Sequence, residues 1–173
     1  MDTITFDGLG ARELLESSKK TFAIENVQSE LDFKFPPEYS TVLEEFKGPI
    51  VFNNGATFKP IQETPVDSEN GFLSLEILYG LRGNSNLIDK NNMYNEQIPS
   101  NLITIGESSG GDQICLSCKT GKVYFWYHEA KTEEYSAYEI SNNIIEFFSS
   151  LKKDDEQHEI KKDIDESGSF LEF

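Results

Sequence analysis

Apolar residues recur at helical spacing in three segments of the chain, residues 22–31, 37–47 and 141–151. The stripes consist of Ile24, Val27 and Leu31, then Tyr39, Val42, Leu43 and Phe46, and finally Ile144, Ile145, Phe148 and Leu151. Such spacing predicts amphipathic helices with one face in the core. Pro37 suits the first turn of the second helix, and Ser141 is a good N-cap for the third.

Between the second and third helices, runs of β-branched, aromatic and apolar residues predict strands. The runs are residues 50–52, 57–58, 72–79, 102–105, 113–118 and 123–127. Residues 119–122 join the last two runs, and Gly121 in this link permits the positive φ of a tight turn, so we expect a β-hairpin there. We also expect a short helix near residues 11–17, and a loop with about one helical turn at residues 84–95.

These elements predict an α+β fold, a single domain in which a mainly antiparallel sheet packs with the N-terminal helices and a C-terminal helix. We place the domain at residues 22–151, with an N-terminal extension at 1–21 and an acidic tail, solvated or disordered, at 152–173. Alternation along the final strand should direct either Trp126 or its neighbours Phe125 and Tyr127 into the core.

Composition agrees with one domain that has its own core. The chain has 173 residues, of which 37% are hydrophobic and 12% aromatic. No apolar run approaches the roughly 18 residues that a membrane helix needs. The N-terminal residues lack the basic start and apolar centre of a signal peptide, so we expect a cytoplasmic protein.

The formal net charge of -16 narrows the choice of partners. Nucleic acid and anionic membranes are excluded as partners, because both are repelled by such a field. A basic protein would be attracted, and its encounter would be accelerated. The alternative is that the acidity serves solubility alone.

Few residues offer catalytic chemistry. His128 ends a strand beside Glu129, but no motif supplies the nucleophile and orienting partner that a catalytic base needs. The glycine-rich segment 106–112 ends in Gly-Asp and leads into a strand, whereas a phosphate-binding loop ends in Gly-Lys-Ser/Thr and leads into a helix. A tight connection between strands is therefore the favoured interpretation of that segment.

Cys115 and Cys118 have the spacing of a redox or zinc pair, but no second pair completes a zinc site. Within a strand, residues three apart point to opposite faces, so two ordinary thiols are the better interpretation. We predict no catalytic, cofactor-binding or metal site and no cofactor.

An ordered set of motifs now becomes recognisable. It contains Phe35-Pro36-Pro37-Glu38-Tyr39, Asn54-Gly55, Leu102–Gly106, Gly111-Asp112 and Gly121-x-Val123-Tyr124-x-Trp126-x-His128. This set closely resembles the SUKH superfamily, the Smi–Knr type of small α+β domain, over about residues 22–151. Phe35 stands where leucine is usual in that family, and Gly48-Pro49 displaces the Asn-Gly that follows the helix.

The resemblance implies a protein-binding function without catalysis. Bacterial members of the family resemble immunity proteins that neutralise a toxin, often a nuclease, and nuclease toxins tend to be basic. As contact points for such a partner we expect acids at loops and strand ends, where side chains project freely. They are Asp67, Glu69, Glu107, Asp112 and Glu129.

Two alternatives remain open. One is a regulatory or scaffold domain without a toxin, as in the cell-wall regulators among the fungal relatives. The other is an enzyme or small-ligand binder that uses the 106–112 segment and His128. A toxin-like reading frame beside the gene would favour immunity over scaffolding, and a bound small molecule would favour the ligand-binding alternative.

Overall fold

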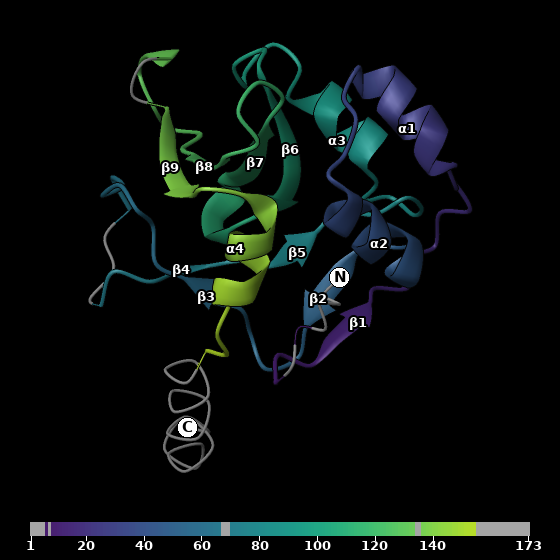
Figure 1. The fold of residues 1–173 in the computed structure, drawn as a ribbon, viewed down its shortest axis with the longest axis horizontal. Coiled ribbons are helices and arrows are strands. Elements are labelled where there is room, and N and C mark those ends of the chain that lie inside the picture. Colours follow the sequence, from purple (N-terminus) through teal and green to yellow (C-terminus); the bar gives the residue numbers. More distant parts are fainter. Residues whose placement is uncertain (1–5, 7, 67–69, 134–135, 155–173) are drawn as a thin grey trace, which may run out of the picture.

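The computed structural model describes residues 6, 8–66, 70–133 and 136–154 (Figure 1). Within these ranges the helices are α1 (Ile24–Leu31), α2 (Pro37–Phe46), α3 (Leu87–Met93) and α4 (Ile144–Ser150). The strands are β1 (Ala11–Glu13), β2 (Ile50–Phe52), β3 (Thr57–Phe58), β4 (Leu73–Ser74), β5 (Ile77–Leu78), β6 (Leu102–Glu107), β7 (Gln113–Ser117), β8 (Val123–Trp126) and β9 (Ala137–Ser141). A 3-10 turn, η1 (Ser109–Gly111), connects β6 to β7.

One seven-stranded sheet organises the molecule. Its order is β1-β2-β5-β6-β7-β8-β9, and every neighbouring pair is antiparallel. Strands β3 and β4 form a separate two-stranded sheet. Because helices pack against an antiparallel sheet, the predicted α+β class is confirmed.

The predicted hairpin is present, with β7 and β8 paired from Gln113↔Trp126 to Leu116↔Val123. Gly121 lies in its turn with a φ of 76°. The predicted helices are present as α1, α2 and α4, although α4 begins later than expected. Its N-cap is Asn143, whose side chain accepts the Glu146 N–H at 2.8 Å, whereas Ser141 ends β9.

Two local predictions were wrong, one was partly right, and one strand was missed. Residues 11–17 form no helix, because residues 11–13 are strand β1 and pair with β2. The run 72–79 is divided into β4 and β5, which belong to different sheets. The segment 84–95 contains the seven-residue helix α3, which is capped by the Asn86 side chain. Strand β9 was not foreseen.

The sheet is buried on both faces, which changes the expectation for the final strand. Phe125 is 1% exposed and packs in the main core. The same core contains Val42 of α2 and Phe148 of α4. Trp126 is 4% exposed and packs in a second, smaller cluster with Ile98, Leu102 and Cys115. Both alternating sets are therefore inside, rather than one of them.

The described part of the N-terminal segment joins this architecture. Phe6 and Leu9 are buried in the main core, and Phe6 contacts Phe148 edge-on at 5.2 Å between ring centroids. The Glu13 carboxylate of β1 accepts two hydrogen bonds from the Arg82 guanidinium, at 2.5 and 2.6 Å. Residue 6 and residues 8–13 thus contribute to the core and to the edge of the sheet.

Candidate functional site

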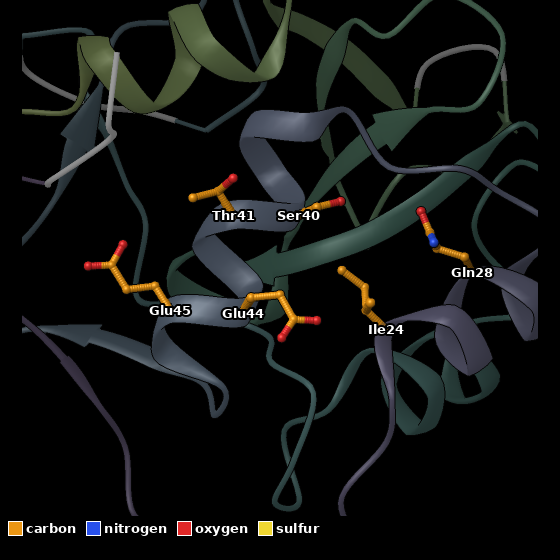
Figure 2. Close-up of a pocket in the computed structure, with 6 residues that line it drawn as sticks. All are labelled: Ile24, Gln28, Ser40, Thr41, Glu44 and Glu45. Atoms are coloured by element: carbon orange, nitrogen blue, oxygen red, sulfur yellow. The ribbon is translucent and has the colours of Figure 1, made fainter. Parts of the chain in front are cut away.

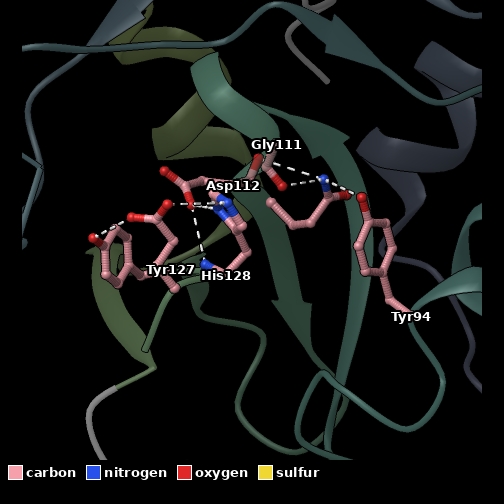
Figure 3. Close-up of polar contacts among 7 residues, drawn as sticks. Tyr94, Gly111, Asp112, Tyr127 and His128 are labelled. Carbon is pink, nitrogen blue, oxygen red and sulfur yellow. Dashed lines mark hydrogen bonds and ion pairs between the residues drawn. The ribbon is translucent and has the colours of Figure 1, made fainter. Parts of the chain in front are cut away.

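Two surface features qualify as candidate sites. One is an open groove between α1 and α2 (Figure 2). The other is the end of the central sheet formed by the β6–β7 connection and residues 127–129, which follow β8 (Figure 3). The second contains the motif residues Gly111, Asp112 and His128 and the described acids that the sequence singled out.

The β6–β7 connection is a tight, glycine-dependent loop. Gly110 and Gly111 have φ values of 75° and 93°, a conformation that side chains with a Cβ resist. The Ser108 N–H donates to the Asp112 carbonyl at 2.7 Å and closes the loop. The Ser108 hydroxyl donates to the Ser74 carbonyl at 2.6 Å and anchors the loop to β4. The glycine-rich segment therefore connects strands, as predicted.

Asp112 and His128 join the two ends of the β7–β8 hairpin (Figure 3). One carboxylate oxygen of Asp112 accepts the backbone N–H of His128 at 3.0 Å and lies 2.5 Å from its Nδ1. An ionised carboxylate accepts only, so this contact places the ring proton on Nδ1. Asp112 is 5% exposed. The expectation that it projects freely is wrong, because its carboxylate is occupied within the fold.

Glu129 lies on the open side of the same histidine. Its side chain is 66% exposed, and one oxygen lies 3.9 Å from His128 Nε2. The other oxygen accepts the Tyr127 hydroxyl at 2.9 Å, and this hydrogen bond raises the pKa of Tyr127. His128 is thus flanked by two carboxylates. Among the described residues, no hydroxyl or thiol is hydrogen-bonded to it, so the arrangement lacks the nucleophile of a catalytic triad.

A network of buried, hydrogen-bonded polar side chains lies next to this end of the sheet. Gln113 is fully buried, and its side-chain oxygen accepts hydroxyl groups from Tyr79 and Thr104, both at 2.7 Å. Its side-chain nitrogen donates to the Tyr94 hydroxyl at 3.2 Å and to the Gly111 carbonyl at 3.0 Å. Burial is the main cause that raises the pKa of Tyr79. Because each member is satisfied by another, the network serves to fix the loop.

Asn91 extends the network to α3. Its side chain accepts the Thr104 N–H and donates to the Thr104 carbonyl, both at 2.9 Å. These bonds lie next to the register shift between Thr104 and Gly106, where β6 departs from regular pairing with β7. Sequence reasoning missed Gln113, Tyr94 and Asn91. The available signal was a glutamine at the start of a strand whose next three residues, Ile114, Cys115 and Leu116, are apolar.

Three of the five predicted contact acids lie at this end of the sheet. Glu107 of β6 pairs with Gln113 of β7, and Gln113 pairs with Trp126 of β8. Asp112 directly precedes Gln113, and Glu129 follows Trp126 by three residues, so the three acids belong to the same end of these strands. Asp67 and Glu69 lie outside the described residues. The partner-binding role of all five stays a prediction.

Metal and thiol chemistry has little support in the described ranges. No group of three or more His, Cys, Asp or Glu residues there could hold a metal ion. Cys115 is buried, which raises the pKa of its thiol, whereas Cys118 is exposed, and neither forms a disulfide. None of the helices in the described segments is long and apolar enough to cross a membrane.

The fold is a small α+β domain, and its conspicuous polar residues serve structural roles. Both features fit the class of protein that the sequence motifs indicated. The chain belongs to the SMI1 / KNR4 family (SUKH-1), whose family model matches residues 22–150. It is similar to the SPbeta prophage-derived uncharacterized protein YokK of Bacillus subtilis (strain 168). The two are 28% identical over 138 residues, which cover 74% of this chain and 72% of that protein. The family resemblance inferred from the motifs is confirmed.

Proposed function

We propose that the protein is an immunity protein that binds and neutralises a cognate toxin, without catalysing a reaction. The observation that supports this most strongly is membership of the SMI1 / KNR4 family over residues 22–150. A relative that is described as prophage-derived agrees with a role in conflict between bacteria or their mobile elements. A cytoplasmic location belongs to the proposal, and two unpaired cysteines suit that reducing compartment.

The charge indicates the chemistry of the toxin. A net charge of -16 favours a basic partner, and a nuclease that binds an anionic substrate presents such a surface. Carboxylates of the immunity protein would then occupy positions that phosphates take in the substrate. Glu107 and Glu129 at the sheet end, together with Asp67 and Glu69, are the proposed contacts. Asp112 contributes by holding His128 and the loop in place.

Co-expression tests the proposal. The reading frame adjacent to the gene is expressed from an inducible promoter, with and without this protein. We expect growth arrest by the neighbour alone, rescue by co-expression, and co-purification of the two proteins. A neighbour that arrests growth, is not rescued and does not co-purify would contradict immunity, and the regulatory-scaffold function would take its place.

A further inference from the structure

The groove between α1 and α2 combines one apolar side chain, Ile24, with uncharged polar side chains and two carboxylates (Figure 2). It has a volume of about 500 Å³ and is lined by Ile24, Gln28, Ser40, Thr41, Glu44 and Glu45. The Gln28 side chain already accepts the Phe35 N–H at 2.8 Å, and the Thr41 hydroxyl donates to the Pro37 carbonyl at 3.0 Å. With these polar groups engaged, the groove presents mainly carbon to a partner.

The charged residues of the two helices are all carboxylates, namely Glu25, Glu30, Glu38, Glu44 and Glu45. Only Glu44 has an ion-pair partner among the described residues, because Lys47 lies 2.5 Å away. The other four form no hydrogen bond or ion pair through their side chains within that part of the chain. Their full charge is available to a cation.

Three of the five acids are placed unfavourably for the helices themselves, whereas Glu25 and Glu38 lie in first turns, where a carboxylate is favoured. Glu30 lies in the last turn of α1, Glu44 and Glu45 lie in the last turn of α2, and neither turn contains a basic residue. The C-terminal end of a helix has a partial negative charge, so it favours cations and disfavours carboxylates. Lys47, the C-cap residue of α2, pairs with Glu44, so the electrostatic cost that remains at the groove lies on Glu45, and a bound cationic group would relieve it.

We propose that this groove docks a cationic, amphipathic segment of the protein partner. An apolar side chain of that segment would lie in the groove near Ile24, and flanking Lys or Arg side chains would meet Glu44 and Glu45. The inference rests on the proposed function only in that the partner is a basic protein. Apolar contact supplies affinity at an interface, and charge supplies selectivity and encounter rate.

A peptide titration tests the groove without knowledge of the toxin. The probe is a short synthetic peptide of leucine and lysine at helical spacing, added to the isotope-labelled full chain and followed by amide NMR shifts. The control peptide has glutamine in place of every lysine. We expect saturable shifts in α1 and α2 that the glutamine peptide fails to produce. Shifts confined to other elements, equal effects of both peptides, or no shifts would overturn the proposal.

A charge reversal at Glu45 separates docking from stability. We expect Glu45→Lys to weaken lysine-peptide binding by about tenfold or more. Its melting temperature should stay the same or rise, because a cation suits the helix C-terminus. The control is Glu133→Lys, with the same charge change in the exposed β8–β9 connection, on the opposite side of Figure 1 from α1 and α2.

The outcomes distinguish the alternatives. Equal weakening by the two variants would mean that net charge alone attracts the peptide, and a lower melting temperature for Glu45→Lys would mean that the carboxylate is structural. Either result overturns the groove proposal. Failure of growth rescue with peptide binding intact would contradict immunity and leave the groove standing.

Discussion

At the scale of single residues, the motif pair Asp112 and His128 has a structural explanation. The carboxylate accepts two hydrogen bonds from a residue sixteen positions away and so ties the open end of the hairpin. A buried acceptor that serves a backbone N–H cannot be replaced by solvent without cost. The motif is therefore accounted for by folding, and the exposed Glu129 beside it is available for contact.

Asp112→Ala should destabilise the protein by about 1–3 kcal/mol, because the His128 N–H loses its buried partner. For a chain of this size that is a fall in melting temperature of about 2–4 °C per kcal/mol. Thermal unfolding followed by circular dichroism measures it. Glu129→Ala is the matched control and should change the melting temperature little, since that side chain is 66% exposed. Equal melting temperatures for Asp112→Ala and the wild type would contradict the structural role.

Two buried tyrosines predict opposite effects of the same substitution. The hydroxyl of Tyr39 is buried and has no hydrogen-bond partner among the described residues, whereas that of Tyr79 donates to Gln113 at 2.7 Å. Tyr39→Phe removes an unsatisfied polar group and should leave stability unchanged or raise it, by up to about 1 kcal/mol. Tyr79→Phe should lower it by about 1 kcal/mol or more. Urea unfolding of both variants checks the difference, and a larger loss for Tyr39→Phe would refute it.

At the scale of elements, success and failure of sequence reasoning follow from how local each signal is. The β7–β8 hairpin was predictable, because two unbroken strand-forming runs flank a turn whose glycine adopts a φ of 76°. Strand β1 was not, because Ala11, Arg12 and Glu13 favour a helix and become a strand only by pairing with β2. Pairing with β2 therefore outweighed the helical propensity of these three residues.

The candidate sites show the same limit. The exposed position of Glu129 follows from its place after a strand. The burial of Asp112 depends on the approach of His128, and the groove depends on how α1 lies against α2. The distance between two segments that are far apart in the sequence cannot be inferred from the spacing of residues within each segment. The family motifs located the sheet end, but they did not separate its structural residues from its exposed ones.

Gly121 tests the hairpin turn in isolation from packing. A Cβ added there would meet no atom within 4 Å, so any cost comes from the positive φ alone. Gly121→Val should destabilise by about 1–2 kcal/mol, because the left-handed region penalises β-branched residues. Gly121→Asn should cost less, since asparagine tolerates that region. Chemical unfolding compares the two, and equal stability of the valine variant would contradict the turn geometry.

The ion pair between β1 and the loop after β5 predicts an acid-dependent term in stability. The hydrogen bond from Arg82 holds the pKa of Glu13 below its ordinary 4.5. A carboxyl group with a lowered pKa contributes stability that is complete above its unfolded pKa and disappears as pH falls through the folded value. The stability difference between wild type and Glu13→Gln should therefore shrink below about pH 4.5. Unfolding curves across this range measure it, and a constant difference would contradict the pair's role.

At the scale of the whole molecule, the net negative charge determines which partners are attracted over long distances. A net charge of -16 on a chain with only 15 basic residues gives a long-range field that attracts cations. Several of those basic side chains are already engaged, including Lys20 with Asp89, Lys47 with Glu44 and Lys122 with Glu139. Apart from Glu44, the acids of α1 and α2 form no ion pair among the described residues, so the side of the molecule where the groove lies carries unpaired negative charge.

This field predicts how a basic partner would associate. Salt should slow association more than it accelerates dissociation, because screening over a Debye length of about 8–10 Å removes long-range attraction before it weakens close contacts. The rates are measured with the immobilised partner from the co-expression test at rising sodium chloride concentrations. Glu45→Lys should raise the dissociation rate if its carboxylate lies in the interface, whereas Glu133→Lys should change mainly the association rate. An association rate independent of salt would contradict electrostatic steering. Identical kinetic effects of the two variants would show that the field acts without the groove.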